Sequence, residues 1–310
     1  MATKVIAAYN SKGGIGKTTI TINLAEMLGI EFGKKVLCID GDPQNSLSFL
    51  ANLPIMEDGI LENENGYYTL GYLEQCIQID GRQPDYEDFE RTIITPTYGK
   101  TIRIENQFGN ETKKLHFHFD LIPGVGRDLS LCELIYINPQ RGDYIFQGNN
   151  VQYARMILQL IVEKIKEYYD YDYILIDTPP GLGIHSLNAL LAADSLIIPT
   201  TPDLLSTIGI SNVIKTLDEL QLYVPDFKVR GVLFNSYTES KHDRNLYDNV
   251  AAYAESMGIP MFDTKIIKNS QVRVLSADEE ISVVKYINTF YEYDKCIYSL
   301  AKEIIKQDEE

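Results

Sequence analysis

One short turn near the N-terminus constrains the fold of this chain more than any other feature. It joins an apolar, β-type run at residues 4–9 to a stretch with helical spacing at residues 18–29. The turn reads Asn10-Ser11-Lys12-Gly13-Gly14-Ile15-Gly16-Lys17-Thr18-Thr19. Glycines in such a turn let backbone N–H groups close around a phosphate, and a helix that begins there adds partial positive charge. The turn therefore predicts a strand–loop–helix unit that binds a phosphate group.

The spacing Gly13-x-x-Gly16-Lys17-Thr18 is the core of a P-loop. In that motif Lys17 neutralises the β- and γ-phosphates of a nucleotide, and the Thr18 hydroxyl ligates Mg²⁺. An incidental glycine-rich turn is the alternative, but the preceding strand and the following helix disfavour it. The standard motif has glycine where this chain has Lys12. A second cation is unnecessary for holding a nucleotide within one chain, so Lys12 calls for a separate explanation.

The composition is that of an ordinary globular protein with one large domain or two small ones. No apolar run reaches the ~20 residues that a membrane-spanning helix needs, and the N-terminus lacks the pattern of a signal peptide. The cysteines show neither CxxC nor zinc-binding spacing; they are Cys38, Cys76, Cys132 and Cys296. We therefore expect a reduced, cytoplasmic protein.

The formal net charge of −16 at first argues against a nucleic-acid partner, because non-specific affinity rests on lysines and arginines that neutralise phosphates. Residues 51–96 and 278–310 contribute −8 and −5 of that charge. Residues 228–273 are mildly basic, with seven lysines and arginines against five acids. A solvated face without a ligand explains such charges equally well. The uneven distribution leaves non-specific DNA binding open.

Strand-like and helix-like segments alternate through most of the sequence. The expected strands are at residues 4–9, 35–40, 119–122, 172–177, 195–199 and 229–234. The expected helices are at residues 18–29, 151–169, 186–193, 206–221, 243–257 and 289–305. The pattern predicts an α/β fold with a doubly wound, mostly parallel sheet and helices on both faces. Ligands bind such sheets at the carboxyl ends of the strands.

Residues 55–118 break this alternation and are acidic and rich in Tyr, Gly and Asn. They include a predicted hairpin in which residues 100–105 pair with residues 114–119 around Gly109-Asn110. We interpret the region as an insertion within a single P-loop domain that spans residues 1–310.

Two histidines, His116 and His118, would share one face of the second hairpin strand. A metal site needs further ligands, and no third ligand accompanies them. The pattern therefore favours a polar strand face over a metal site.

Two strands deliver carboxylates to the sheet edge at which the turn lies. The strand at 35–40 ends in Asp40-Gly41-Asp42, and the strand at 172–177 ends in Asp177. An apolar strand with one aspartate at its carboxyl end is the Walker B arrangement, in which that aspartate holds Mg²⁺ through water. The pair after residues 35–40 could contact the metal indirectly and orient a water molecule. A tight acidic turn and a helix cap are the structural alternatives.

Together these segments resemble the ParA/MinD family of deviant Walker ATPases, most of all its ParA branch. Three segments carry the resemblance most specifically: Asn10–Thr19, Val36–Asn45 and Tyr173–Pro180. Weaker likenesses lie at Ile122-Pro123-Gly124 with Asp128-Leu129-Ser130, at Ile198-Pro199-Thr200 and at Gly231–Asn235. The resemblance covers nearly the whole chain in order, except residues 55–118. It implies a P-loop ATPase that binds ATP and Mg²⁺.

The resemblance also gives Lys12 an explanation. In the family, the signature lysine at this position reaches across a nucleotide-sandwich dimer to the phosphates bound by the partner subunit. Gly13 would have to remain small because the two loops meet there. Lys12, Lys17 and Asp42 are the implied catalytic residues, and Asp42 orients the attacking water.

Further site residues follow from the same resemblance. The implied nucleotide-binding residues are Gly13, Gly14, Ile15, Gly16, Lys17, Thr18, Thr19 and Asn235. Thr19 would contact the α-phosphate, and Thr18, Asp40 and Asp177 would hold or support the metal. Asn235 resembles the adenine-recognising residue of the family, although a simple strand-end turn also explains an asparagine there.

In ParA proteins, the surface near the last strands binds DNA without sequence preference when ATP has joined two subunits. Here the corresponding residues are Lys265, Lys268 and Arg273. Residues 266–277 match the family only loosely, and the expected proline after Ile267 is absent.

The expected function is an ATP-dependent homodimer switch with Mg²⁺-dependent hydrolysis, weak alone and stimulated by a ParB-like or adaptor protein. It would partition or position a plasmid, a chromosome region or another cargo, in the cytoplasm and at the nucleoid where DNA is bound. MinD-like positioning on a membrane or a protein matrix is the alternative. The acidic C-terminal segment Lys302–Glu310 disfavours a membrane, since anionic lipid would repel it.

Two other classes share parts of this pattern. An iron–sulfur protein on the same fold needs paired cysteines from two subunits, but Cys132 has no nearby companion in a glycine-rich loop. A bacterial tyrosine kinase is suggested by Tyr286, Tyr291, Tyr293 and Tyr298. That family lacks the signature lysine, and packing of a helix explains the tyrosines.

Overall fold

The computed structural model describes residues 2–51, 53, 69–78, 80–106, 109–124, 156–203, 206–220, 227–268 and 283–310. Seven strands form one sheet in the order β5-β2-β6-β1-β7-β8-β9, and every neighbouring pair is parallel. They are β1 (Lys4–Ala8), β2 (Val36–Asp40), β5 (Asp120–Ile122), β6 (Tyr173–Asp177), β7 (Ser195–Thr200), β8 (Lys228–Tyr237) and β9 (Met261–Ile267). The predicted α/β fold with a parallel sheet is confirmed.

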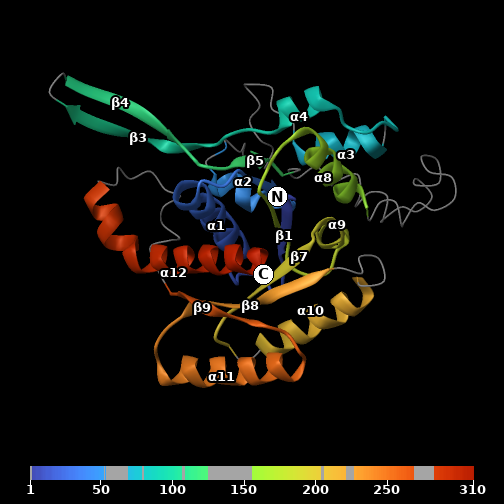
Figure 1. Cartoon of the computed structure of the whole chain (residues 1–310), viewed down its shortest axis with the longest axis vertical. Helices are drawn as coiled ribbons and strands as arrows, with labels where there is room; N and C mark the ends of the chain where they lie inside the picture. Colours follow the sequence, from blue (N-terminus) through green and yellow to red (C-terminus); the bar gives the residue numbers. More distant parts are fainter. Residues whose placement is uncertain are drawn as a thin grey trace.

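Helices cover both faces of this sheet (Figure 1). Alternate strand residues point to opposite faces, so Ile174 and Ile176 of β6 join one core and Tyr173 and Leu175 join the other. The first core is covered by α3 (Leu70–Gln78), α4 (Tyr86–Thr92), α8 (Ile157–Tyr168), α9 (Ile184–Ala192), α10 (Ser206–Leu220) and α11 (Lys241–Ser256). The second is covered by α1 (Lys17–Phe32), α2 (Ser46–Leu50) and α12 (Val283–Glu309).

The predicted elements agree with the structure to within a few residues at most of their ends. Residues 151–155 of the helix predicted at 151–169 lie outside the described residues. The short helices α2, α3 and α4 and the strand β9 were not predicted. In β9, the polar residues Asp263 to Lys265 are exposed or half-buried, because this strand lies at the sheet edge. It therefore lacks the continuous apolar run of the central strands.

The last helix, α12, begins six residues before its predicted start and lies against α1 and β9. Its apolar residues Ile297, Leu300 and Ile304 are buried in the second core. Near its end, the Asp308 carboxylate accepts from the Arg230 guanidinium at 2.7 Å and from a tyrosine hydroxyl of β6 at 2.9 Å. The apolar face of α12 is thus used inside the chain. None of the described helices combines the length and the apolar composition that crossing a membrane requires.

The predicted hairpin is present as a two-stranded antiparallel sheet of β3 (Thr97–Asn106) and β4 (Gly109–His116), and it extends away from the main sheet (Figure 1). Its register differs from the prediction. Gly109 and Asn110, expected in the turn, are instead residues of β4 that pair with Asn106 and Glu105. Residues 107–108 lie outside the described residues. The reason lies at the other end, where Phe117 and Phe119 leave the hairpin and enter the second core.

The predicted face shared by the two histidines is therefore wrong, because His118 lies beyond the end of β4. Its backbone N–H and its ring Nδ1 instead lie 2.7 and 2.8 Å from the two carboxylate oxygens of Glu26 on α1. This contact ties the base of the hairpin to the helix that follows the glycine-rich loop.

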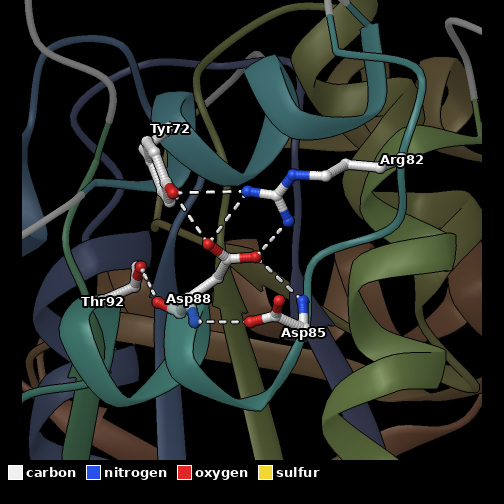
Figure 2. Close-up of polar contacts among 5 residues, drawn as sticks. All are labelled: Tyr72, Arg82, Asp85, Asp88 and Thr92. Atoms are coloured by element: carbon white, nitrogen blue, oxygen red, sulfur yellow. Dashed lines mark hydrogen bonds and ion pairs between the residues drawn. The ribbon is translucent and has the colours of Figure 1, made fainter.

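A polar network joins α3 to α4 within the region predicted as an insertion (Figure 2). The Asp88 carboxylate accepts from Arg82 through both oxygens, from the Tyr72 hydroxyl at 2.7 Å and from the backbone N–H of Asp85 at 2.9 Å. Asp85 caps the helix in return by accepting from the backbone N–H of Asp88 at 3.1 Å. These bonds position α4 over the first core. The assignment of residues 55–118 as an insertion in one domain stays a prediction.

Candidate functional site

The candidate site lies where the central strands end. Because the strands are parallel, their carboxyl ends meet at one edge of the sheet. In the register, Asp177 at the end of β6 is paired with Asp40 on one side and with Ala8 on the other. The loop at residues 9–16 follows β1 directly. The structure therefore brings together the loop and the carboxylates that the sequence singled out.

The conformation of the loop requires its glycines. Gly14 and Gly16 have φ angles of 71° and 89°, in the left-handed region that a side chain disfavours. Gly16 is also the N-cap of α1, and no side chain caps that helix end. The first turn of α1 contains no acidic residue either. Its free N–H groups and the positive end of the helix dipole thus form a site for an anion.

Lys17 lies buried within this loop. Its Nζ donates to the backbone carbonyls of Lys12 at 3.2 Å and of Asn10 at 3.4 Å. Burial lowers the pKa of Lys17, and the nearby charges of Asp177 and Asp42 oppose that shift. The ammonium group therefore lies among the loop, the two carboxylates and the start of α1.

The Asp177 side chain is fully buried, and among the described residues neither of its oxygens has a partner that satisfies hydrogen-bond geometry. Burial, followed by repulsion from Asp40, raises the pKa of Asp177 to about 8, while the neighbouring Thr18 hydroxyl and Lys17 lower it. Buried polar groups are almost always paired in proteins. An unpaired carboxylate beside an anion site therefore marks a place for a cation or for ordered water.

Asp40 is buried just as deeply, but its oxygens are engaged. Ser48 donates to it from its backbone N–H at 2.8 Å and from its hydroxyl at 2.6 Å, and the N–H of Asp42 approaches it at 3.3 Å. Burial still raises the pKa of Asp40 to about 6. The Ser48 hydroxyl in turn accepts from the Gly124 N–H at 3.0 Å. The contacts of Asp40 thus hold the segment that carries Asp42.

Sequence reasoning missed Ser48, although it follows the acidic segment by a few residues. It also left Gly124 unexplained. A Cβ at Gly124 would lie 2.3 Å from the Asn45 side chain and 3.2 Å from Asp40, so only glycine fits. Asp42 itself is buried, and its Oδ1 accepts from the Gln44 N–H at 2.9 Å. The companion segment at residues 128–130 lies outside the described residues.

Lys12 forms an ion pair with Asp203, which follows β7. The two side chains are 36% and 32% exposed, so the pair lies at the surface. Asp203 also accepts from the Thr201 hydroxyl at 2.6 Å. Sequence reasoning missed Asp203; the available signal was an acidic residue just after a strand that ends at the same sheet edge.

Asn235, near the end of β8, contacts the loop rather than open space. Its Nδ2 donates to the carbonyl oxygen of Ile15 at 2.7 Å, and its Oδ1 accepts from the N–H of Ser236 at 2.8 Å. Thr19, which is also predicted to bind the nucleotide, lies in the first turn of α1. Its backbone carbonyl accepts from the Asn23 side chain at 2.6 Å. Their roles toward a nucleotide stay predictions.

Of the residues expected to contact DNA, Lys265 and Lys268 lie at the end of β9 and just after it, at the same sheet edge. The Lys265 Nζ lies 3.9 Å from the centre of the Tyr247 ring and 5.5 Å from that of Tyr237, in a cation–π arrangement. Lys268 is exposed. Arg273 lies outside the described residues, so the expected cluster is described only in part.

A family model described as an AAA domain matches residues 3–229 of this chain. The uncharacterised protein MJECL24 of Methanocaldococcus jannaschii is 35% identical over 238 residues, which are 76% of this chain and 74% of the relative. The sporulation initiation inhibitor protein Soj of Bacillus subtilis is 27% identical over 231 residues, which are 74% of this chain and 71% of Soj.

Solved structures share the fold over almost the whole chain. Apo McdA of Cyanothece superposes with a TM-score of 0.69 at 19% identity, covering 97% of this chain and 99% of that one. The septum site-determining protein MinD of Pyrococcus horikoshii, solved with Mg-ADP, gives 0.62 at 23% identity, with coverage of 99% and 97%. From the matched family model and the relative at 35% identity, this chain belongs to the ParA/MinD-type family of AAA-domain P-loop ATPases.

Proposed function

We propose that this chain is an ATP-driven dimerisation switch that hydrolyses ATP with Mg²⁺ and positions a cargo. The observation that carries the proposal is the division of labour between two lysines of one loop. Lys17 is buried against the loop carbonyls, whereas Lys12 is held at the surface by Asp203. A nucleotide in this chain has Lys17 as its internal cation. Lys12 serves a nucleotide held by a second copy once it separates from Asp203; its position at the surface supports this role.

Exposed apolar side chains beside the loop support a face that a second copy covers. Leu182 and Ile208 are 49% and 56% exposed. Leu182 follows a glycine whose N–H donates to the carbonyl of Ser11 at 3.0 Å, and Ile208 precedes a glycine that packs against Asn10. Both therefore adjoin the segment that carries Lys12. Burying them against another copy would add apolar contact to an otherwise polar face.

Gly13 supports the same proposal. A Cβ built on Gly13 would meet only Pro180, at the ordinary contact distance of 3.7 Å, and its φ is not in the left-handed region. Within the described part of one chain, nothing there requires a glycine. A loop of a second copy that approaches closely would supply the requirement.

We propose Asp42 as the residue that orients the attacking water, with hydrolysis giving ADP and phosphate. Mg²⁺, when bound, neutralises charge on the β- and γ-phosphates. Asp177, with its unpaired oxygens, and the Thr18 hydroxyl are the protein groups that fit this ion. The described residues hold no group of three or more His, Cys, Asp or Glu side chains that could hold a metal alone. Mg²⁺ sites built from one or two carboxylates plus substrate phosphates have this sparse character.

For the cargo, we propose DNA, a plasmid or a chromosome region, bound without sequence preference by the dimer and released when a ParB-like or adaptor protein stimulates hydrolysis. One relative supports this choice by its name: the chromosome partitioning protein ParA of Myxococcus xanthus, which is 28% identical over 235 residues. Lys268 is exposed for such a contact, while Lys265 is engaged with two tyrosine rings. In the part of α12 whose side chains the structure describes, Ile297, Leu300 and Ile304 are buried in the second core, which disfavours a membrane as the matrix.

Purified protein with ATP, in the presence and absence of Mg²⁺, tests the enzymatic part. We expect slow, Mg²⁺-dependent phosphate release that Lys17→Ala abolishes and that Lys302→Ala, an exposed lysine of α12, leaves unchanged. Absence of Mg²⁺-dependent ATP binding in the unmodified chain would contradict the proposal. A random DNA duplex should shift only with Mg-ATP, and less as salt rises. If the duplex did not shift even at low salt, the proposal of DNA as the cargo would be wrong, and a protein cargo would take its place.

A further inference from the structure

The Asn235 side chain is fixed at both ends, so its orientation is unambiguous. The carbonyl of Ile15 needs a donor, and the N–H of Ser236 needs an acceptor. Only one rotation of the amide satisfies both, with Nδ2 at the loop and Oδ1 at Ser236. Asn235 is 9% exposed, and its bond to the loop spans 220 residues of sequence. A buried side chain held in this way is a structural strut between β8 and the loop.

Two backbone features fit this strut. Ser236 has a φ of 58°, and Asn45 is the only other described non-glycine residue with positive φ. A residue with a side chain disfavours this conformation, and here it accompanies the bond from the Ser236 N–H to Asn235. On the other side, a Cβ at Gly16 would lie 2.3 Å from the Asn235 Nδ2. The amide therefore occupies the space that the missing side chain of Gly16 leaves.

The bond to Ile15 also sets the direction of a loop N–H. A trans peptide unit is planar, and its C=O and N–H point in opposite directions. No described peptide bond is cis. Because Asn235 holds the carbonyl of Ile15, the N–H of Gly16 in the same peptide unit points away from β8. Gly16 is the N-cap of α1, so this N–H belongs to the group that an anion would meet.

We propose that Asn235 is a positioning residue for phosphate binding: it orients the Ile15–Gly16 peptide so that the loop presents an N–H to the phosphates. This inference rests on the proposed nucleotide site and deepens it. It assigns Asn235 to the affinity for the polyphosphate, and it leaves selection of the base to other residues. The resemblance instead implies contact with adenine, so the two roles make opposite predictions.

Calorimetric titration of the full chain with ATP, GTP and inorganic tripolyphosphate separates these roles. Asn235→Ala should weaken the binding of ATP and of tripolyphosphate by the same factor, about tenfold for one lost hydrogen bond. Asn235→Asp should weaken the binding of both by more than Asn235→Ala does, because it also adds a negative charge beside the loop. The ratio of ATP to GTP affinity should stay as in the unmodified chain. The inference would be overturned if Asn235→Ala bound ATP more weakly but bound tripolyphosphate with unchanged affinity. A changed ratio of ATP to GTP affinity would also overturn it. If the unmodified chain bound neither ATP nor tripolyphosphate, the proposed function itself would fail.

The chain offers a matched control in Asn188, which is equally buried. Its Nδ2 donates to the carbonyl of Ile184 at 3.0 Å, and its Oδ1 accepts from the N–H of Leu158 at 3.2 Å, away from the loop. Asn188→Ala should lower stability to a similar degree but leave tripolyphosphate affinity unchanged. An equal loss of affinity in both variants would overturn the inference, because general destabilisation would then explain it.

Steady-state kinetics gives a second readout. Loss of oriented binding raises KM and leaves kcat within about threefold, because Asn235 touches no reacting atom. Loss of folded protein has the reverse effect, since fewer active molecules lower the apparent kcat and leave KM unchanged. The reverse pattern in Asn235→Ala would contradict a positioning role.

Discussion

Two buried aspartates, one at the sheet edge and one between α3 and α4, have opposite electrostatic surroundings. At the sheet edge, Asp177 has no hydrogen-bond partner among the described residues, and burial raises its pKa to about 8. Between α3 and α4, Asp88 accepts from Arg82, Tyr72 and a backbone N–H (Figure 2). These contacts, the hydrogen bonds from the Arg82 guanidinium most of all, hold the pKa of Asp88 well below its usual range.

The difference separates the group that we propose for metal binding, Asp177, from a structural one, Asp88. Burial alone does not distinguish them, since both carboxylates are almost inaccessible to water. The partners do. A carboxylate whose partners are all within the chain contributes to stability. One that is buried without partners costs stability, and it persists where a ligand supplies the missing contacts.

The largest expected effect is the dependence of stability on pH in the absence of Mg²⁺ and nucleotide. Because the pKa of Asp177 is about 8 in the folded chain and about 4 for an ordinary aspartate, the folded chain keeps a proton between about pH 4 and 8 that the unfolded chain has already released. Stability should therefore fall as pH rises through that window. The loss is on the order of a few kcal/mol, since one pKa unit is worth about 1.4 kcal/mol.

Urea unfolding at pH 5 and pH 8 measures this effect. Asp177→Asn should be more stable than the unmodified chain at pH 8 and should show a shallower pH dependence. Asp88→Asn serves as the control, because a lowered pKa places its own titration below this window. If the unfolding free energy of Asp177→Asn changed with pH as steeply as that of the unmodified chain, Asp177 would not be the carboxylate that lowers stability as pH rises.

A loss of hydrolysis without a loss of stability is expected for Asp42→Ala. Removing the group that orients water should lower ATP turnover roughly 100-fold, in the range for one acid–base or positioning residue. ATP affinity and the urea midpoint should stay close to those of the unmodified chain. Asp85→Ala, which removes an aspartate from the α3–α4 network, is the control and should keep its turnover. If ATP turnover in Asp42→Ala stayed within about tenfold of that of the unmodified chain, another residue would have to orient the attacking water.

The reverse pattern is expected for Asp88→Ala. The change leaves the Tyr72 hydroxyl and the Asp85 N–H without their acceptor, at a cost of about 2 kcal/mol in unfolding free energy. The ion pair adds little, because Arg82 is 42% exposed. ATP affinity should remain unchanged. Weakened ATP binding at unchanged stability would place this network in the functional site.

The smallest effect is expected for Tyr72→Phe. The variant removes one hydroxyl that donates to Asp88 and keeps the ring, so the unfolding free energy should fall by about 1 kcal/mol. Turnover and ATP affinity should not change. A stability equal to that of the unmodified chain would show that Arg82 and the Asp85 N–H satisfy Asp88 without the Tyr72 hydroxyl.

Local patterns made most of the sheet predictable. Apolar runs define β1, β2 and β6, the last two of which end in an aspartate, and the parallel arrangement then brings their ends together. The edge strand β9 escaped prediction because half of it faces solvent.

The contacts that make the site specific join residues far apart in sequence. Lys12 meets Asp203 across 191 residues, and Ser48 meets Gly124 across 76. No local signal encodes such pairs, because they arise only when the loops at one sheet edge are packed together. The same holds for the partners that separate Asp88 from Asp177. Both residues are aspartates in the sequence. Only the fold shows that Asp88 has hydrogen-bond partners around it and that Asp177 has none among the described residues.

In the proposed function, Lys12 completes a nucleotide site in a second copy. Light scattering of Asp42→Ala with Mg-ATP tests it directly, because this variant is expected to bind ATP without consuming it. We predict that its molar mass doubles with Mg-ATP, and that Lys12→Ala combined with Asp42→Ala binds ATP but keeps the mass of one chain. A doubled mass in the combined variant would contradict the claim.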